Sequence, residues 1–400
     1  MNFDDNSLYN IKSSVDGKRY SLFELATWKN GLAFKKINFC ETGVPVIKIA
    51  ELNNGIGGTT AYTQQTFSED VHLCKGDLLF SWSGNPQTSI DIFRFNLDEG
   101  WLNQHIFKVT PDEKIVDRDY FYFLMKNLKP HFTQIATNKQ TTGLGHVTIA
   151  DIKRMSVVIP SLDVQREIVS YIKPIDDKIE LNNEINNNLE QQAKALYKDW
   201  FFDFSPFSSD GNLPDGWRLG SVGDIIQLHD SKRVPLSGAE RDKMAKVYPY
   251  YGATSLMDYV DNYLFDGVYL LLGEDGTVVD SLGFPILQYV YGQFWVNNHA
   301  HIITGKEGFS VEELYLFFSL TNIKSIVTGA VQQKVSQQNL KKVPAIIPSK
   351  EALGAFDEII QPIFAQIRNL RDENVNLAQL RDALLPKLMS GELDVSDIDL

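Results

Sequence analysis

Residues 146–161, HVTIADIKRMSVVIPS, recur in altered form as residues 334–349, KVSQQNLKKVPAIIPS, and this pair of segments decides how the chain is organised. A second pair, WLNQH at 101–105 and WVNNH at 295–299, repeats at nearly the same separation. Each of these is followed by an aromatic-rich stretch, DYFYFLMKN (119–127) and ELYLFFSLTN (313–322). Such a repeat is far longer than the repeats of solenoid proteins, so the pattern predicts a duplicated domain.

Each repeated unit also opens and closes on a similar pattern. At the start, YSLFEL (20–25) is matched with WRLGSV (217–222), because each places an aromatic residue ahead of a spaced apolar pair. At the end, each unit passes into a stretch in which apolar residues recur at spacings of three and four, as in a coiled-coil helix. The pattern predicts one long helix after each globular part, here called a head.

The two long helices are predicted to pack antiparallel on each other and to form a rigid spacer between the heads. Their polar interruptions, Asn186 and Asn374, fall at the same place in the pattern, and a buried polar residue fixes the register of paired helices. An alternative stays open here, in which both asparagines are exposed on two independent amphipathic helices. The residues expected along the spacer are Ile172, Ile179, Asn186, Leu189, Leu196, Ile360, Ile367, Asn374, Leu377 and Leu384.

Short β-like runs mixed with a few helical stretches predict an α+β fold for each head. The chain is then a pseudo-two-fold internal repeat, with two similar heads separated by two long antiparallel coiled-coil helices. The expected segments are a first head at 1–161, a first long helix at 162–204, a linker rich in Ser, Pro, Gly and Asp at 205–216, a second head at 217–349, a second long helix at 350–390 and a C-terminal tail at 391–400.

Charge and composition restrict what the chain binds. The formal net charge of −13 argues against nonspecific binding of polyanions by the whole surface. Basic residues outnumber acidic ones at 101–150 and 301–350, so any nucleic acid would contact local patches. The sequence has no run apolar enough for a membrane helix and no secretion signal, which predicts a cytoplasmic protein without a membrane partner. Cys40 and Cys74 are expected to be buried thiols.

Common catalytic signatures are absent from the sequence, including GxGxxG, GxxxxGK(S/T), HExxH and GxSxG. Asp215, Asp230 and Lys232 have the residue types of a metal-dependent phosphodiesterase, but the first unit has no equivalent set, so a nuclease is the weaker hypothesis. His105 and His299 match by the repeat, and both are expected to be satisfied, partly buried side chains, because no second ligand follows at metal spacing. We therefore expect no catalytic residue and no metal site.

Polar, glycine-rich loops at similar places in the two heads are the candidate DNA-reading segments. Asn, Gln, Arg and Lys side chains read base edges, and Gly, Ser and Thr let the backbone approach phosphates. The loop at 81–85 is matched with 248–252, and the loop at 138–146 with 329–334. The candidates are Lys35, Lys36, Trp82, Ser83, Asn85, Lys139, Gln140, Thr141, Thr142, Gly143 and His146 in the first head, and Lys232, Arg233, Tyr250, Tyr251, Gly252, Gln332, Gln333 and Lys334 in the second.

Three separated strings closely resemble the specificity subunit of type I restriction-modification systems: ALYKDWFFDFSPF (195–207), LPDGWRLGSVGDI (213–225) and LLPKLMSGELDV (384–395). KGDLLFSWSG (75–84) and the two Ile-Pro-Ser junctions support the resemblance, which spans residues 20–395 in the order head, helix, head, helix. It implies that each head is a target-recognition domain that reads one half of a bipartite, asymmetric site in double-stranded DNA.

The resemblance also implies a division of labour among subunits. The specificity subunit of the family is not catalytic and carries no cofactor; two modification (methyltransferase) subunits with S-adenosylmethionine dock on its helices. Restriction (motor-nuclease) subunits that use ATP and Mg join this complex. A stand-alone adaptor, with the coiled coil for oligomerisation and the heads for protein partners, remains the alternative from another class. Neither the bases that are read nor the spacer length follows from the sequence.

Overall fold

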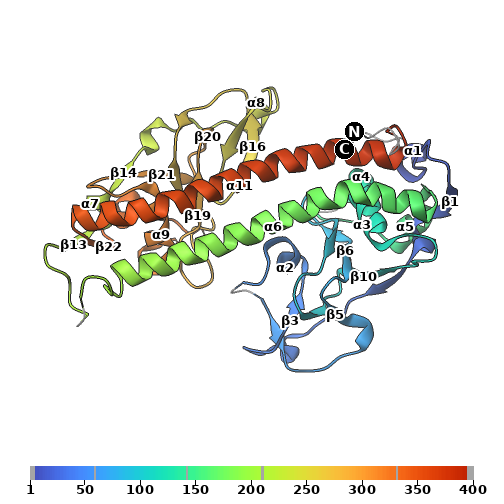
Figure 1. Ribbon diagram of the computed structural model, residues 1–400, viewed down its shortest axis with the longest axis horizontal. Coiled ribbons are helices and arrows are strands. Elements are labelled where there is room, and N and C mark those ends of the chain that lie inside the picture. The colour runs from blue at the N-terminus through green and yellow to red at the C-terminus, as the bar shows by residue number, and fades with distance from the viewer. Residues whose placement is uncertain (1–4, 58–59, 141–142, 209–210, 330–331, 394–400) are drawn as a thin grey trace. The chain divides into compact units, whose positions relative to one another are not determined.

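A computed structural model describes residues 5–57, 60–140, 143–208, 211–329 and 332–393 (Figure 1). The chain divides into two compact units, one formed by the residues up to Leu181 together with those from Glu373 onward, the other by Asn182–Asp372. Each unit contains one head and parts of both long helices, so the division runs through the helices. Each head mixes sheets with short helices, and this confirms the α+β class.

The first head contains two four-stranded sheets. Their strand orders are β2 (Ala26–Asn30), β10 (Ile106–Pro111), β6 (Leu78–Ser81), β8 (Asp91–Arg94), and β4 (Tyr62–Thr63), β3 (Val44–Ile47), β9 (Glu99–Leu102), β5 (His72–Cys74). Two short ribbons pair β1 (Lys18–Ser21) with β12 (Ser156–Ile159), and β7 (Ser83–Gly84) with β11 (Gly145–His146). The α-helices of this head are α1 (Asp5–Tyr9), α2 (Ile49–Asn54), α3 (Arg118–Asn127), α4 (Lys129–Asn138) and α5 (Ile149–Arg154).

The second head repeats this arrangement. Its four-stranded sheets have the orders β14 (Ile226–Leu228), β21 (Ala300–Gly305), β18 (Tyr269–Gly273), β19 (Leu287–Val290), and β16 (Leu256–Val260), β15 (Tyr248–Tyr251), β20 (Gln293–Val296), β17 (Phe265–Asp266). One ribbon pairs β13 (Arg218–Ser221) with β22 (Pro344–Ile347). The α-helices of this head are α7 (Val222–Ile225), α8 (Gly238–Arg241), α9 (Val311–Leu320) and α10 (Gln337–Leu340).

Strand pairing corrects how the openings of the two units were matched. Arg218 faces Ile347 in the second head as Lys18 faces Ile159 in the first, so Ser221 corresponds to Ser21 and Val222 to Leu22. The match of Leu219 with Leu22 was therefore wrong. Leu219 lies in strand β13 and is 76% exposed, whereas Leu22 follows its strand and is fully buried. The apolar residue that directly follows each strand, Leu22 or Val222, is the one that is fully buried.

Helices α3 and α9 carry the repeated aromatic stretches into the two main cores. The Asp117 carboxylate caps α3 by accepting the backbone N–H groups of Asp119 and Tyr120, and Ser310 caps α9 in a capping box with Glu313. Phe121 and Phe318 are fully buried. Both helices are rich in aromatic and aliphatic residues, which proteins bury. Each helix therefore lies within the hydrophobic core of its unit.

The two long helices are α6 (Leu162–Phe201) and α11 (Lys350–Ser390). Within the unit that holds the first head, Arg381 Nη1 lies 2.8 Å from Asp176 Oδ1. Within the other unit, Arg371 Nη2 lies 2.9 Å from Glu190 Oε1. Lys178 also pairs with Glu373 in the first of these units, and Tyr197 packs on Phe356 in the other. In each unit a residue further along α6 therefore meets a residue earlier in α11, so the segments of the two helices run antiparallel there (Figure 1).

The alternative of two independent helices is wrong, because the seam residues face inward. Asn186 is 6% exposed, and half-buried Asn374 donates from Nδ2 to the Ile179 carbonyl oxygen at 3.5 Å. None of the ten residues expected along the spacer is exposed. Ile172 and Ile360 belong to the cores of the heads, so the helices are built into the heads as well as paired with each other.

Two other expectations have plain outcomes. Cys40 and Cys74 are both exposed, so the prediction of buried thiols was wrong. Cys74 is the last residue of strand β5, and Cys40 forms an isolated bridge with Tyr62. Among the described residues, no helix combines the length and the apolar character needed to cross a bilayer.

Candidate nucleic-acid interface

Two of the predicted recognition segments of the first head lie side by side. Strand β7 pairs with strand β11, with Gly84 opposite Gly145 and Ser83 opposite His146. A side chain at Gly84 would meet the Ser89 side chain at 2.6 Å, so close packing as well as its positive φ of 126° favours glycine there. The pairing joins the loop after β6 to the loop before α5 and makes one composite surface of them.

Trp82 connects this surface to the core of the first head. Its indole Nε1 donates to Asn30 Oδ1 at 3.0 Å, and its ring stacks on Phe107 with centroids 5.7 Å apart. Its carbonyl oxygen accepts the Val147 N–H at 2.8 Å, which fixes the start of the second loop. Trp82 was expected to contact DNA, but in this structure its ring is partly buried against the core.

Lys139 is also engaged within the protein. Its ammonium lies 2.5 Å from the carboxylate of Asp151, whose side chain is 3% exposed. Burial opposes ionisation of Asp151, but the hydrogen bonds from Lys139 and Thr148 outweigh it and hold the pKa of this carboxyl below its usual value. Lys139 therefore neutralises a buried carboxylate, and its ammonium is not free to bind a phosphate.

The remaining candidates of the first head differ in accessibility. Ser83 and His146 are half-buried in the ribbon, while the other described candidates are exposed. The exposed ones are Lys35, Lys36, Asn85, Gln140 and Gly143. Thr141 and Thr142 lie outside the described residues.

In the second head the loop at 332–334 is exposed and firmly attached at its base. Thr328 and Lys334 exchange two backbone hydrogen bonds of 2.9 and 2.8 Å, and the Gly276 N–H donates to the Gln333 carbonyl oxygen at 3.0 Å. Gln332, Gln333 and Lys334 are all exposed. This loop thus sits beside the segment after β18, as the loop before α5 sits beside the segment after β6.

The match of 81–85 with 248–252 was wrong. Strand β15, which holds Tyr250, runs parallel to β20 as β3 runs parallel to β9, so β15 corresponds to β3. Tyr250 is 1% exposed, with Arg241 stacked over its ring, and Gly252 is also buried. Tyr251 is half-buried. Tyr250 is thus buried within a sheet and Gly252 at the end of its strand, and neither can meet DNA there without opening the sheet. The counterpart of 81–85 is the segment around Glu274, because it bridges to the 332–334 loop as β7 pairs with β11.

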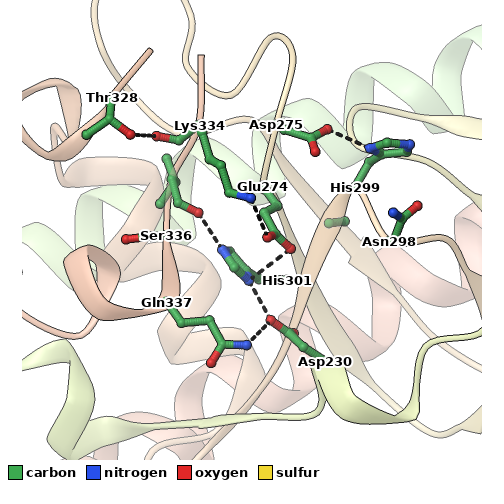
Figure 2. Close-up of polar contacts among 12 residues, drawn as sticks. Asp230, Glu274, Asp275, Asn298, His299, His301, Thr328, Lys334, Ser336 and Gln337 are labelled. Carbon is green, nitrogen blue, oxygen red and sulfur yellow. Dashed lines mark hydrogen bonds and ion pairs between the residues drawn. The ribbon is translucent and has the colours of Figure 1, made fainter. Parts of the chain in front are cut away.

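Sequence reasoning missed a charged cluster beneath the loop of the second head, although it had weighed Asp230 in another role. Asp230, Glu274 and His301 come from different strands and turns, and candidate ligand atoms of the three lie within 4.8 Å of one another (Figure 2). His301 Nδ1 lies 2.6 Å from Asp230 Oδ2, and His301 Nε2 lies 2.8 Å from the Val335 carbonyl oxygen. The repeat aligned only His299 with His105 and gave no signal for His301.

The cluster is compensated by the protein's own cations. Arg233 Nη1 lies 2.6 Å from Glu274 Oε2, and Lys334 Nζ lies 3.4 Å from Glu274 Oε1. Burial disfavours the charged form of Asp230, yet the contacts with His301, the Ile302 N–H and Arg233 prevail and lower its pKa. With both imidazole nitrogens engaged and two cations on the carboxylates, this group fits an ionic network better than a metal centre.

The nuclease hypothesis is not supported by these positions. Asp215 is exposed in the turn before β13, whereas Asp230 is buried and held by His301. Lys232 is exposed, and neighbouring Arg233, an expected DNA contact, turns inward to the carbonyl oxygens of Asn298 and Ala300 as well as to Glu274. The described residues therefore assemble no two-carboxylate site from this set.

Comparisons with known proteins agree with the duplicated architecture. The model of a family described as type I restriction modification DNA specificity domain matches residues 15–191 and again residues 214–379. The chain is 26% identical over 326 residues to the type I restriction enzyme MjaIX specificity subunit of Methanocaldococcus jannaschii, which covers 74% of this chain and 73% of that protein. It is 25% identical over 400 residues to the type I restriction enzyme HindI specificity subunit of Haemophilus influenzae, covering 80% of this chain and 87% of that one.

A solved structure shows the same fold. The crystal structure of the S subunit of a type I restriction-modification system from M. genitalium superimposes with a TM-score of 0.52 at 15% identity, over 94% of this chain and 97% of that chain. Each family match spans one head and part of the long helix that follows it.

Proposed function

The chain belongs to the type I restriction modification DNA specificity family, and from this membership we propose how its heads and helices share the work of DNA recognition. It is a DNA-recognition subunit of the type I restriction-modification kind and a non-catalytic one. Each head reads one half of a bipartite, asymmetric site in double-stranded DNA. The observation that carries this proposal is the duplicated topology, in which two equivalent heads end in different loop side chains.

The composite surfaces of the two heads would contact the bases. Gln140 and Asn85 in the first head and Gln332 and Gln333 in the second are exposed amides on segments tied to a rigid sheet. Amide side chains form paired hydrogen bonds with base edges, and rigid support keeps such bonds selective. Because the two loops carry different residues, the two half-sites should differ in sequence.

The long helices would set the distance between half-sites and dock two modification subunits. Helices of 40 and 41 residues can span a full turn of DNA at 1.5 Å per residue. Leu181, Val375 and Leu380 are exposed large apolar residues on these helices, at 49%, 56% and 48%. Partner subunits would cover these side chains in the complex.

Cofactors belong to the partner subunits in this proposal. The modification subunits would supply S-adenosylmethionine, and the restriction subunits would supply ATP and Mg. A complex that modifies chromosomal DNA would act in the cytoplasm.

Methylome sequencing tests the proposal. The chain is co-expressed with modification subunits in a host that lacks this methylation, and modified adenines are mapped. A new bipartite methylated motif is the expected result. A purified stoichiometric complex that leaves no methylated motif would contradict DNA recognition, and failure to form any complex would favour the adaptor role. Removing matched heptads from both long helices should also change the spacer of the motif.

A further inference from the structure

The loop at 332–335 of the second head is held at its base by the charged cluster beneath it. The Val335 N–H donates to the Glu274 carbonyl oxygen at 2.8 Å, and the Val335 carbonyl oxygen lies 2.8 Å from His301 Nε2. The neighbouring Lys334 ammonium approaches the Glu274 carboxylate (Figure 2). The backbone and a side chain of the loop are thus fixed by the same two residues.

His301 connects this loop to the sheet. Both of its ring nitrogens face oxygen atoms, one a backbone carbonyl and the other the Asp230 carboxylate. Asp230 is oriented in turn by the Ile302 N–H at 2.9 Å and by the Gln337 amide at 2.6 Å. The groups facing His301 are Asp230 and Glu274, and these carry Arg233 and Lys334 as counterions.

The first head builds the same position from uncharged side chains. Trp82 corresponds to Glu274, because its carbonyl oxygen accepts the Val147 N–H as that of Glu274 accepts the Val335 N–H. Phe107 corresponds to His301, because each lies opposite the residue that stands two positions before Trp82 or Glu274 in the chain. That residue is Phe80 in the first head and Leu272 in the second. Stacking on Phe107 and one hydrogen bond to Asn30 hold Trp82, where ion pairs hold Glu274.

We propose that Asp230, His301 and Glu274 are positioning residues that hold the 332–335 loop of the second head in its DNA-reading geometry, an inference that rests on the proposed function. A buried ionic network is directional, since each charge must keep its partner at hydrogen-bond distance. The loop backbone is therefore set by electrostatics in the second head and by aromatic packing in the first. The network acts on selectivity for one half-site alone.

Glu274→Gln is the first variant, because it removes the charge that pairs with Lys334 and Arg233 and keeps the shape of the side chain and its backbone acceptor. Glu307→Gln is the matched control, the same change at an exposed position of the same head. Complexes with modification subunits are titrated with duplexes that carry the intact site, a scrambled first half-site or a scrambled second half-site. Hydrogen exchange of Val335 and melting temperature are measured on the same samples.

For Glu274→Gln we expect discrimination at the second half-site to fall about tenfold, the change produced by losing one charge-assisted hydrogen bond. Discrimination at the first half-site stays within twofold of the wild type, and the melting temperature does not change. The Val335 N–H exchanges faster. The Glu307→Gln control stays within twofold of the wild type at both half-sites. Unchanged second-half-site discrimination in the Glu274→Gln complex would overturn the inference and leave the proposed function standing. A wild-type complex that discriminates neither half-site would overturn the proposed function instead.

Asp230→Asn covers the case in which Glu274→Gln lowers the melting temperature. It leaves Arg233 and Lys334 on Glu274 but weakens the hold of Asp230 on His301. Selective loss at the second half-site, with retained melting, supports the positioning role. Equal loss at both half-sites would mean that the cluster only stabilises the fold.

Discussion

Replacing Glu313 by Gln should remove a pH dependence from the stability of the second head. Glu313 is fully buried at the start of α9, where its Oε2 accepts the Ser310 N–H at 2.7 Å. Its Oε1 has no hydrogen-bond partner among the described residues. Burial raises the pKa of this carboxyl to about 8, with the negative charges of Asp357 and Glu312 adding to the shift and the Ser310 bonds opposing it.

The magnitude follows from the difference between folded and unfolded pKa values. Folding favours the protonated carboxyl, so the favourable contribution is fully present below the unfolded value of 4.5 and is lost as the pH rises through about 8. Each pH unit in this interval lowers the free energy of unfolding by about 1.4 kcal/mol, or by up to about 5 kcal/mol in all. Glutamine is neutral at every pH and keeps a similar shape, so the variant lacks this slope.

The assay compares the stability of the second head in the wild type and in Glu313→Gln between pH 5 and pH 8. Hydrogen exchange of α9, residues 311–320, reports the opening free energy of the second head separately from the first, which matters because two heads need not unfold together. The stability of Glu313→Gln relative to the wild type should rise steadily across this range. Parallel pH profiles for both proteins would refute the reasoning, because they would mean that Glu313 is ionised in the folded head.

Three further predictions concern a buried ion pair, the openings of the two heads and an exposed loop amide. Lys139→Met should lower the unfolding free energy of the first head by roughly 3 kcal/mol, because it strands the buried Asp151 charge, and a normal melting temperature would show that the pair is dispensable. Leu22→Ala should destabilise the first head by about 2 to 5 kcal/mol, whereas Leu219→Ala changes the second by less than about 0.5 kcal/mol; equal effects in denaturant titrations would restore the earlier match of the two openings. Gln332→Ala should weaken binding to the cognate duplex at an unchanged melting temperature, and full affinity would remove this exposed side chain from the interface.

Local patterns were enough for the architecture. The long helices were predicted at nearly their observed bounds, because a period of three and four residues repeated over forty positions reflects one physical cause, the burial of a single helix face. The duplication was visible for a related reason: WLNQH and WVNNH fall at equivalent strands, β9 and β20, whose burial restricts the residues that fit.

Residue type did not predict what the loop side chains contact. Lys139 and Arg233 are basic, and their residue type and loop context predicted contacts with DNA, yet both turn inward to carboxylates. Tyr250 was assigned to a polar, glycine-rich loop, but it lies in the interior of a four-stranded sheet. Residue type states which bonds a side chain can form, and only the neighbours decide which bonds it does form.

The sequence by itself determined the duplicated α+β heads, the paired long helices and the family, because each depends on periodicity or on strings of residues close together in the chain. Only the tertiary structure decided that Asp230, Glu274 and His301 meet under the loop that carries Lys334. These residues are brought together by β21 pairing with β14 on one side and β18 on the other. Such contacts follow from strand order, which no short stretch of sequence encodes.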